Sequence, residues 1–147
     1  MSADARALMK ANLEGMRKSV EWLRRSHAKC VGIGIRTSYS VDEFDAFENL
    51  ASRFARTIDI VVNKVFRSID SMELEDGGTL IDVINRAEKR ALIDSAERIR
   101  DLKQLRNDIV HEYETDDLQH LFSQTLEATP ELFLMAEKAA HYCTRFG

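Results

Sequence analysis

The sequence is poor in residues that break helices or cross-link chains. Its 147 residues include one proline, six glycines and two cysteines. Cys30 and Cys143 lie near opposite ends, with neither a CxxC motif nor a histidine at metal-ligand spacing. These features disfavour a disulfide framework and a zinc site, and we expect two free thiols in a reducing compartment. With 44% hydrophobic residues, the chain can bury a core without such cross-links.

Long apolar runs are also missing. A membrane-spanning helix needs about 20 consecutive apolar residues, and no stretch of the sequence approaches this length. The N-terminus carries Asp4, Arg6, Lys10 and Glu14 where a secretory signal would need an apolar segment. We therefore expect a single domain over residues 1–147, located in the cytoplasm and without a membrane anchor.

Neither sign of charge dominates strongly. The net charge is -4, which disfavours general coating of nucleic acid. Residues 1–36 nevertheless hold eight basic and three acidic side chains, whereas residues 108–117 hold five acids and no Lys or Arg. A basic face on an acidic protein is one interpretation of this uneven distribution, and ordinary solvated helix faces are the other.

The apolar residues recur at helical rather than alternating spacing, so we predict an all-α, up-and-down bundle of five to six helices. The clearest element begins at Ser40 and Glu43, which have the spacing of a capping box. Apolar residues then follow in steps of three and four: Phe44, Phe47, Ala51, Phe54, Ile58, Val61, Val65 and Ile69. This seam predicts one long central helix over residues 42–72, packed at a shallow angle against its neighbours.

Shorter patterns predict the helices on either side of this element. One helix is expected over residues 3–28, followed by a connection at "KCVGIGIRTS" because of its glycines. Thr79 can cap a short helix to about residue 91, and Asp94 with Glu97 can cap the next one.

The single proline lies in the last helical region, which we expect to begin near Thr115. Thr129 directly precedes Pro130, the arrangement of an N-cap followed by proline at the first helical position. This pair predicts either two helices or one kinked helix in the C-terminal region.

The segment "RNDIVHEY", residues 106–113, places an arginine, a histidine and a tyrosine around an apolar pair. At about 100° per residue, Arg106 falls within one apolar arc of its helix. The arc consists of Ile99, Leu102, Leu105, Ile109 and Val110. An arginine there is costly unless it is paired or lies at an interface. His111 points to another side, with Asn107 directly beneath it, and Tyr113 lies almost above Arg106.

Each of these residues has an ordinary structural role open to it. Arg106 can extend from the edge of the arc or pair with an acid on another helix. A histidine near a helix end, as His111 is, is commonly a capping or surface residue. Tyr113 can be a packed tyrosine whose hydroxyl finds a partner. Spacing on one helix does not choose between these roles and catalysis.

Arg106, His111 and Tyr113 have the spacing R-x4-H-x-Y. This motif, the chain length and the long preceding helix resemble the HEPN-domain ribonuclease toxins, in particular the HepT-like toxins of HEPN and minimal nucleotidyltransferase toxin–antitoxin systems. The resemblance covers most of the chain and is strongest from residue 40 to 113. It implies a HEPN-type bundle, RNA as the substrate, and a homodimer in which both motifs face one cleft.

Cleavage of RNA uses the 2′-hydroxyl as the nucleophile, so it needs proton transfer and charge stabilisation but no strictly required metal or cofactor. The resemblance implies that Arg106 holds the phosphate and that His111 transfers protons. Asn107 would orient His111 or hold a ribose or phosphate oxygen. Arg106 and His111 diverge by about 140° on a straight helix, which makes a composite site in a dimer part of the hypothesis.

The resemblance also implies regulation through Tyr113. A cognate nucleotidyltransferase antitoxin would transfer AMP to this tyrosine, and the added phosphate would occupy the anion site beside Arg106 and repel RNA. Two alternatives stay open. One is a non-catalytic HEPN scaffold or substrate-binding partner of a nucleotidyltransferase, and the other is a helical interaction module in which Arg106 and His111 are structural.

Overall fold

The computed structural model describes residues 3–75, 77–111 and 115–147, and all regular structure in these ranges is helical. The elements are α1 (Ala3–Ile33), α2 (Val41–Asp59), the π-helical η1 (Ile60–Phe66), α3 (Arg67–Met72), α4 (Leu80–Lys89), α5 (Ala96–His111), α6 (Thr115–Cys143) and the 3-10 turn η2 (Thr144–Phe146). This confirms the predicted all-α helical bundle. Within the same ranges, no helix is both long and apolar enough to cross a membrane.

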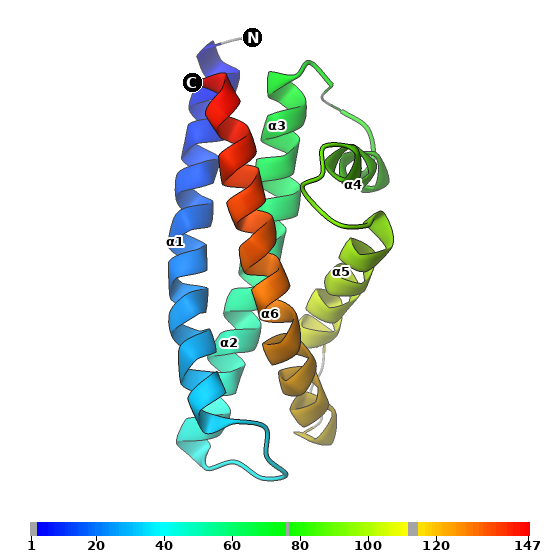
Figure 1. Ribbon diagram of the computed structural model, residues 1–147. Helices are drawn as coiled ribbons and strands as arrows, with labels where there is room; N and C mark the ends of the chain where they lie inside the picture. Colours follow the sequence, from blue (N-terminus) through cyan, green and yellow to red (C-terminus); the bar gives the residue numbers. More distant parts are fainter. Residues whose placement is uncertain (1–2, 76, 112–114) are drawn as a thin grey trace.

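Long helices run side by side through the molecule (Figure 1). α1 runs in one direction, and the rod formed by α2, η1 and α3 returns beside it. α5 descends along the flank of this rod, and α6 returns to the end of the bundle at which α1 begins. The short helix α4 lies across the flank between α3 and α5. The rod thus has neighbours on several sides, which explains its long apolar seam.

The long rod begins as the sequence predicts. Ser40 is the N-cap: its Oγ accepts from the Glu43 N–H at 3.2 Å, and Glu43 accepts in return from the Ser40 N–H at 2.9 Å. This backbone hydrogen bond holds the pKa of Glu43 below its usual range, and Arg36 lowers that pKa further. All the seam residues are buried except Phe44, which is half-buried. The rod ends at Met72, so the predicted helix over residues 42–72 is confirmed with one addition.

The addition is the π-helical segment in the middle of the rod, which the three-and-four spacing did not predict. Its i→i+5 hydrogen bonding widens the turn. Two adjacent apolar pairs are buried here, Val61 with Val62 and Val65 with Phe66. The segment contacts α1, α4 and α6. Because adjacent side chains are both buried in this segment, the rod packs against several helices at the same level.

Helix α1 is longer than expected, and the predicted connection after residue 28 was wrong. The helix continues because Cys30 is buried and its thiol donates to the Ala46 carbonyl of α2 at 3.4 Å. Gly34, with φ of +80°, ends the helix, and its N–H donates to the Cys30 carbonyl at 2.9 Å. A left-handed glycine of this kind is a common helix terminator.

The predicted N-cap of α4 is confirmed, and the predicted N-cap of α5 was wrong. Thr79 caps α4 through a capping box with Asp82, and the helix ends at Lys89. For α5 the cap is Ser95 rather than Asp94: the Ser95 Oγ accepts from the Arg98 N–H at 3.0 Å. Asp94 instead lies exposed, 3.6 Å from the Lys138 ammonium. Asp94 and Ser95 are adjacent in the sequence, so the prediction placed the start of the helix one residue too early.

Thr129 does not cap a helix, and this prediction was wrong. It lies buried within α6, where its hydroxyl donates back to the Thr125 carbonyl at 2.7 Å. α6 begins at Thr115 as predicted and runs through Pro130 as one helix. Of the two predicted outcomes, the structure shows a single helix containing the proline.

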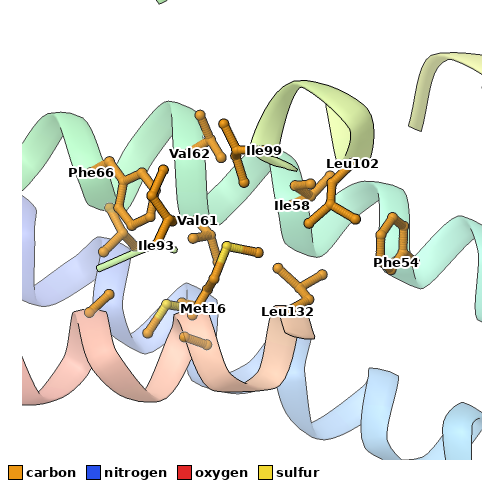
Figure 2. Close-up of a cluster of buried hydrophobic side chains, with 14 of the residues drawn as sticks. Met16, Phe54, Ile58, Val61, Val62, Phe66, Ile93, Ile99, Leu102 and Leu132 are labelled. Atoms are coloured by element: carbon orange, nitrogen blue, oxygen red, sulfur yellow. The ribbon is translucent and has the colours of Figure 1, made fainter. Parts of the chain in front are cut away.

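The core lies between the rod and the helices around it. Figure 2 shows part of this core, with Met16 of α1, Phe54 and Ile58 of α2, Leu102 of α5 and Leu132 of α6. Each of these side chains is at most 2% exposed. The core therefore fixes where α5 lies relative to α2, and with it the surroundings of the R-x4-H-x-Y motif.

One buried carboxylate connects α3 to α4. Asp70 is 1% exposed and accepts hydrogen bonds from Arg86, at 3.2 Å, and from Arg90. Glu73 lies 3.4 Å from Arg90 and accepts from the Tyr142 hydroxyl of α6. Burial by itself would lower the pKa of Arg90, but the hydrogen bond and charge of Asp70 raise it overall. The network holds α4 against α3 and α6.

We predict that Asp70→Asn lowers the free energy of unfolding by about 3 kcal/mol, because it removes the buried carboxylate that Arg86 and Arg90 share and leaves them with the more exposed Glu73 and Glu75. Urea denaturation followed by circular dichroism measures this loss. The matched control is Asp94→Asn, which removes an exposed carboxylate and should change stability by less than about 1 kcal/mol. Equal losses in the two variants would contradict a special role for Asp70.

Candidate ribonuclease site

Helix α5 carries the motif, and its apolar arc leaves the core towards its C-terminal end. Ile99, Leu102 and Leu105 are buried. Ile109 is half-buried, and Val110 is 45% exposed. The predicted arc therefore faces the core over its first turns and faces solvent at the turn that carries the motif.

Arg106 is held by a carboxylate from the long rod. Its Nε and Nη2 both donate to Oδ2 of Asp59, at 3.1 and 2.9 Å. Lys103 donates to the other oxygen of Asp59 at 3.4 Å. The side chains of Arg106 and Asp59 are 29% and 31% exposed. Asp59 is the last residue of α2, directly before the π-helical segment, so the rod places it opposite α5.

This ion pair is one of the ordinary roles that the sequence left open for Arg106. It does not use all of the guanidinium. Nη1 of Arg106 donates to the Asn107 side chain at 3.3 Å, which with the two bonds to Asp59 makes three hydrogen bonds. An arginine has five N–H donors, so within the described part of the chain two N–H groups are left for a ligand. Asp59 thus orients Arg106 and leaves it able to bind an anion.

Arg106 lies in the wall of a groove between α2, α5 and α6, with a volume of about 470 Å³. The charged lining residues are Glu48, Arg56, Asp59 and Arg106. Apolar lining comes from Ala51, Ala55, Ile109, Val110, Leu118, Leu121 and Phe122. Arg56 is exposed and adds a second guanidinium to the groove that contains Arg106. The groove therefore combines two guanidinium groups and two carboxylates with apolar surface.

His111 is not part of this groove. It is exposed and is the last described residue of α5, while Arg106 lines the groove wall. A single copy of the chain thus does not bring the two predicted catalytic residues together there. Asn107 contacts Arg106 rather than His111. Tyr113 lies outside the described residues, so the structure leaves its predicted role as it stood.

Three residues of this site were missed in the sequence: Asp59, Lys103 and Arg56. Asp59 had a visible signal, because it is an acid between Ile58 and Ile60 in an otherwise apolar run. Lys103 stands three residues before Arg106, one turn earlier on the same helix. Arg56 carries no such signal, because exposed arginines on amphipathic helices are common.

The two cysteines are free, as predicted, and the structure shows that both are buried. Burial raises the pKa of each thiol to about 11, against a smaller opposing effect of nearby cations. At neutral pH both thiols are therefore protonated and poor nucleophiles. Among the described residues, no group of three His, Cys, Asp or Glu side chains is placed to hold a metal ion.

Comparison with protein-family models finds no match to this chain. Neither the curated proteins nor the solved structures give a significant match. The functional argument below therefore depends on the residues of this chain and on their arrangement.

Proposed function

We propose that the protein is a metal-independent endoribonuclease toxin whose site is composed of Arg106 and His111 from two copies of the chain. The observation that carries this proposal is the R-x4-H-x-Y motif with its arginine oriented at the wall of the groove between α2, α5 and α6. Asp59 holds the guanidinium in this position, with 2.9 Å between Nη2 of Arg106 and Oδ2 of Asp59. A fixed arginine is suited to a phosphate because it binds two oxygens at once.

The proposed reaction is transfer of a phosphodiester to its own ribose. The 2′-oxygen forms a bond to phosphorus, the bond to the 5′-oxygen breaks, and the products are a 2′,3′-cyclic phosphate and a 5′-hydroxyl end. Within each site, His111 of one copy removes the 2′-proton and then delivers a proton to the leaving 5′-oxygen. Arg106 stabilises the negative charge on the phosphate oxygens in the transition state.

The homodimer is required because the two residues lie on different sides of α5. The apolar surface for a second copy is available at the same place, since Val110 is exposed and Ile109 and Leu118 are half-buried. Two-fold packing of these surfaces would bring the His111 of each copy towards the groove of the other. Arg106 would then lie at the rim of the shared cleft.

We predict RNA cleavage by the wild-type protein in the presence of a chelator, and a loss of at least about 100-fold in Arg106→Ala and His111→Ala. Gel analysis of RNA fragments measures the rate. Arg98→Ala is the matched control, because Arg98 lies on the same helix but pairs with Glu131 of α6 at 2.9 Å. Circular dichroism checks the fold of Arg106→Ala, which frees Asp59. Full activity of His111→Ala would exclude it as the proton-transfer residue.

The composite site makes a separate prediction about mixtures. Arg106→Ala and His111→Ala, each inactive alone, should regain cleavage when they are mixed and allowed to exchange subunits, because one hybrid site contains both intact residues. The measurement is the same assay after co-refolding, with either variant refolded alone as the control. A mixture as inactive as its components, or sedimentation of the wild type as a monomer at micromolar concentration, contradicts the composite site.

A second candidate is a non-catalytic HEPN scaffold that partners a nucleotidyltransferase. The Asp59–Arg106 ion pair favours it, since the pair by itself accounts for an arginine in the apolar arc. The chelator assay separates the two functions: folded wild-type protein with unmodified Tyr113 and no cleavage of RNA supports the scaffold. A neighbouring nucleotidyltransferase gene fits both candidates and disfavours a general interaction module.

We also propose that a cognate nucleotidyltransferase antitoxin silences the site by transferring AMP to Tyr113. Incubation of the protein with that partner and ATP should add mass in AMP units at Tyr113 and abolish cleavage, because the added phosphate competes for Arg106. Peptide mass spectrometry locates the modification. Tyr113→Phe is the control that cannot be modified there; if it is still inactivated by the enzymatic activity of the partner, Tyr113 is not the switch.

A further inference from the structure

The single tryptophan of the chain is exposed on α1. Trp22 is 49% exposed, although a ring of this size is ordinarily well buried. Two guanidinium groups lie against it: that of Arg25 at 4.9 Å and that of Arg53 at 5.0 Å from the ring centroid. An exposed aromatic ring with arginines beside it is a typical component of sites that bind nucleic acid bases.

The two arginines are held differently. Arg53 comes from α2 and is anchored on α1, where its Nη1 donates to the Ser26 hydroxyl at 2.7 Å and to the Trp22 carbonyl at 3.4 Å. Arg25 is exposed and lies one turn beyond Trp22 on the same helix. A base that stacks on the ring would therefore displace Arg25, whose charge would then be free to pair with a phosphate. Arg53 would stay in place.

The surroundings of Trp22 are basic rather than apolar. Lys18 and Lys29 are exposed and, at four residues before and seven after Trp22, lie on the same face of α1. Glu21 is exposed but lies about 100° away around the helix. A partner helix would need apolar anchors at these spacings. The positions hold cations instead, which favours a polyanion.

This basic face continues to the groove that contains Arg106. Arg56 lies one turn after Arg53 on α2, is exposed, and lines that groove. Positive side chains thus extend from Lys29 and Arg25, past Trp22 and Arg53, to Arg56. A single strand bound in the groove would follow this line of charge because its backbone is anionic.

We propose that Trp22, with Arg25 and Arg53, forms a stacking platform for one base of single-stranded RNA whose backbone runs past Arg56 into the groove. This inference rests on the proposed ribonuclease function for its substrate, and it assigns a role to the basic N-terminal helix. The platform binds RNA outside the cleavage site and is independent of base identity, since every base has a face that can stack.

Because Trp22 is the only tryptophan, its fluorescence reports on the platform directly. Titration with a single-stranded 2′-O-methyl oligonucleotide, which cannot be cleaved, should quench it. Trp22→Ala and Arg25→Ala should each weaken binding of a labelled oligonucleotide about tenfold, measured by fluorescence anisotropy. Arg24→Ala is the matched control: Arg24 stacks on Phe133 at 4.4 Å and pairs with Glu137 at 3.4 Å, both on α6. It should bind as the wild type does.

The outcomes separate this inference from the proposed function. Quenching by the oligonucleotide without cleavage of unmodified RNA supports the platform and contradicts the ribonuclease. Cleavage with unchanged Trp22 fluorescence, and with Trp22→Ala as active as the wild type, overturns the platform and leaves the ribonuclease standing. Equal quenching by an acidic peptide of the same charge also overturns it, because charge alone would then explain binding.

Discussion

Burial of the apolar seam on the rod from Val41 to Met72 is the constraint on which the rest of the structure depends. α1 and α6 pack along this rod, and α5 packs on its flank. Because the seam is longer than one neighbour can cover, the bundle is built around it. This packing sets the direction in which the polar residues of the rod leave the helix. Asp59 pairs with Arg106 and Lys103 of α5, and Asp70 pairs with Arg86 and Arg90 at α4.

The ion pairs of these two carboxylates have different effects, one on stability and the other on the orientation of an arginine. Asp70 is almost fully buried among Arg86 and Arg90, and breaking such a pair leaves charge in a region that water does not reach. Asp59 is about one third exposed, so its ion pair with Arg106 adds little to stability. Its effect is orientation instead. A guanidinium that is held but accessible is what an anion site needs.

Much of the fold was predictable because its signals are local. The capping box at Ser40 and the three-and-four spacing of the seam each involve residues within a few turns of one another. Errors arose where distant packing decided the outcome: Cys30 extends α1 by packing on α2, and Thr129 is helical within a buried stretch of α6. In the site, the sequence predicted that Arg106 could pair with an acid on another helix. It did not identify that acid, because Asp59 lies 47 residues away and a helical wheel shows the residues of one helix only.

The π-helical segment between Asp59 and Asp70 has a consequence for the phase of the rod. In an uninterrupted α-helix, residues eleven positions apart point only about 20° away from each other and lie about 16 Å apart along the axis. The wider turns of η1 shift this phase, and Asp59 meets α5 whereas Asp70 meets α4. The segment thus lies between a structural anchor, Asp70, and an arginine-orienting carboxylate, Asp59, and sets their relative direction. Its length is therefore constrained from both ends of the rod.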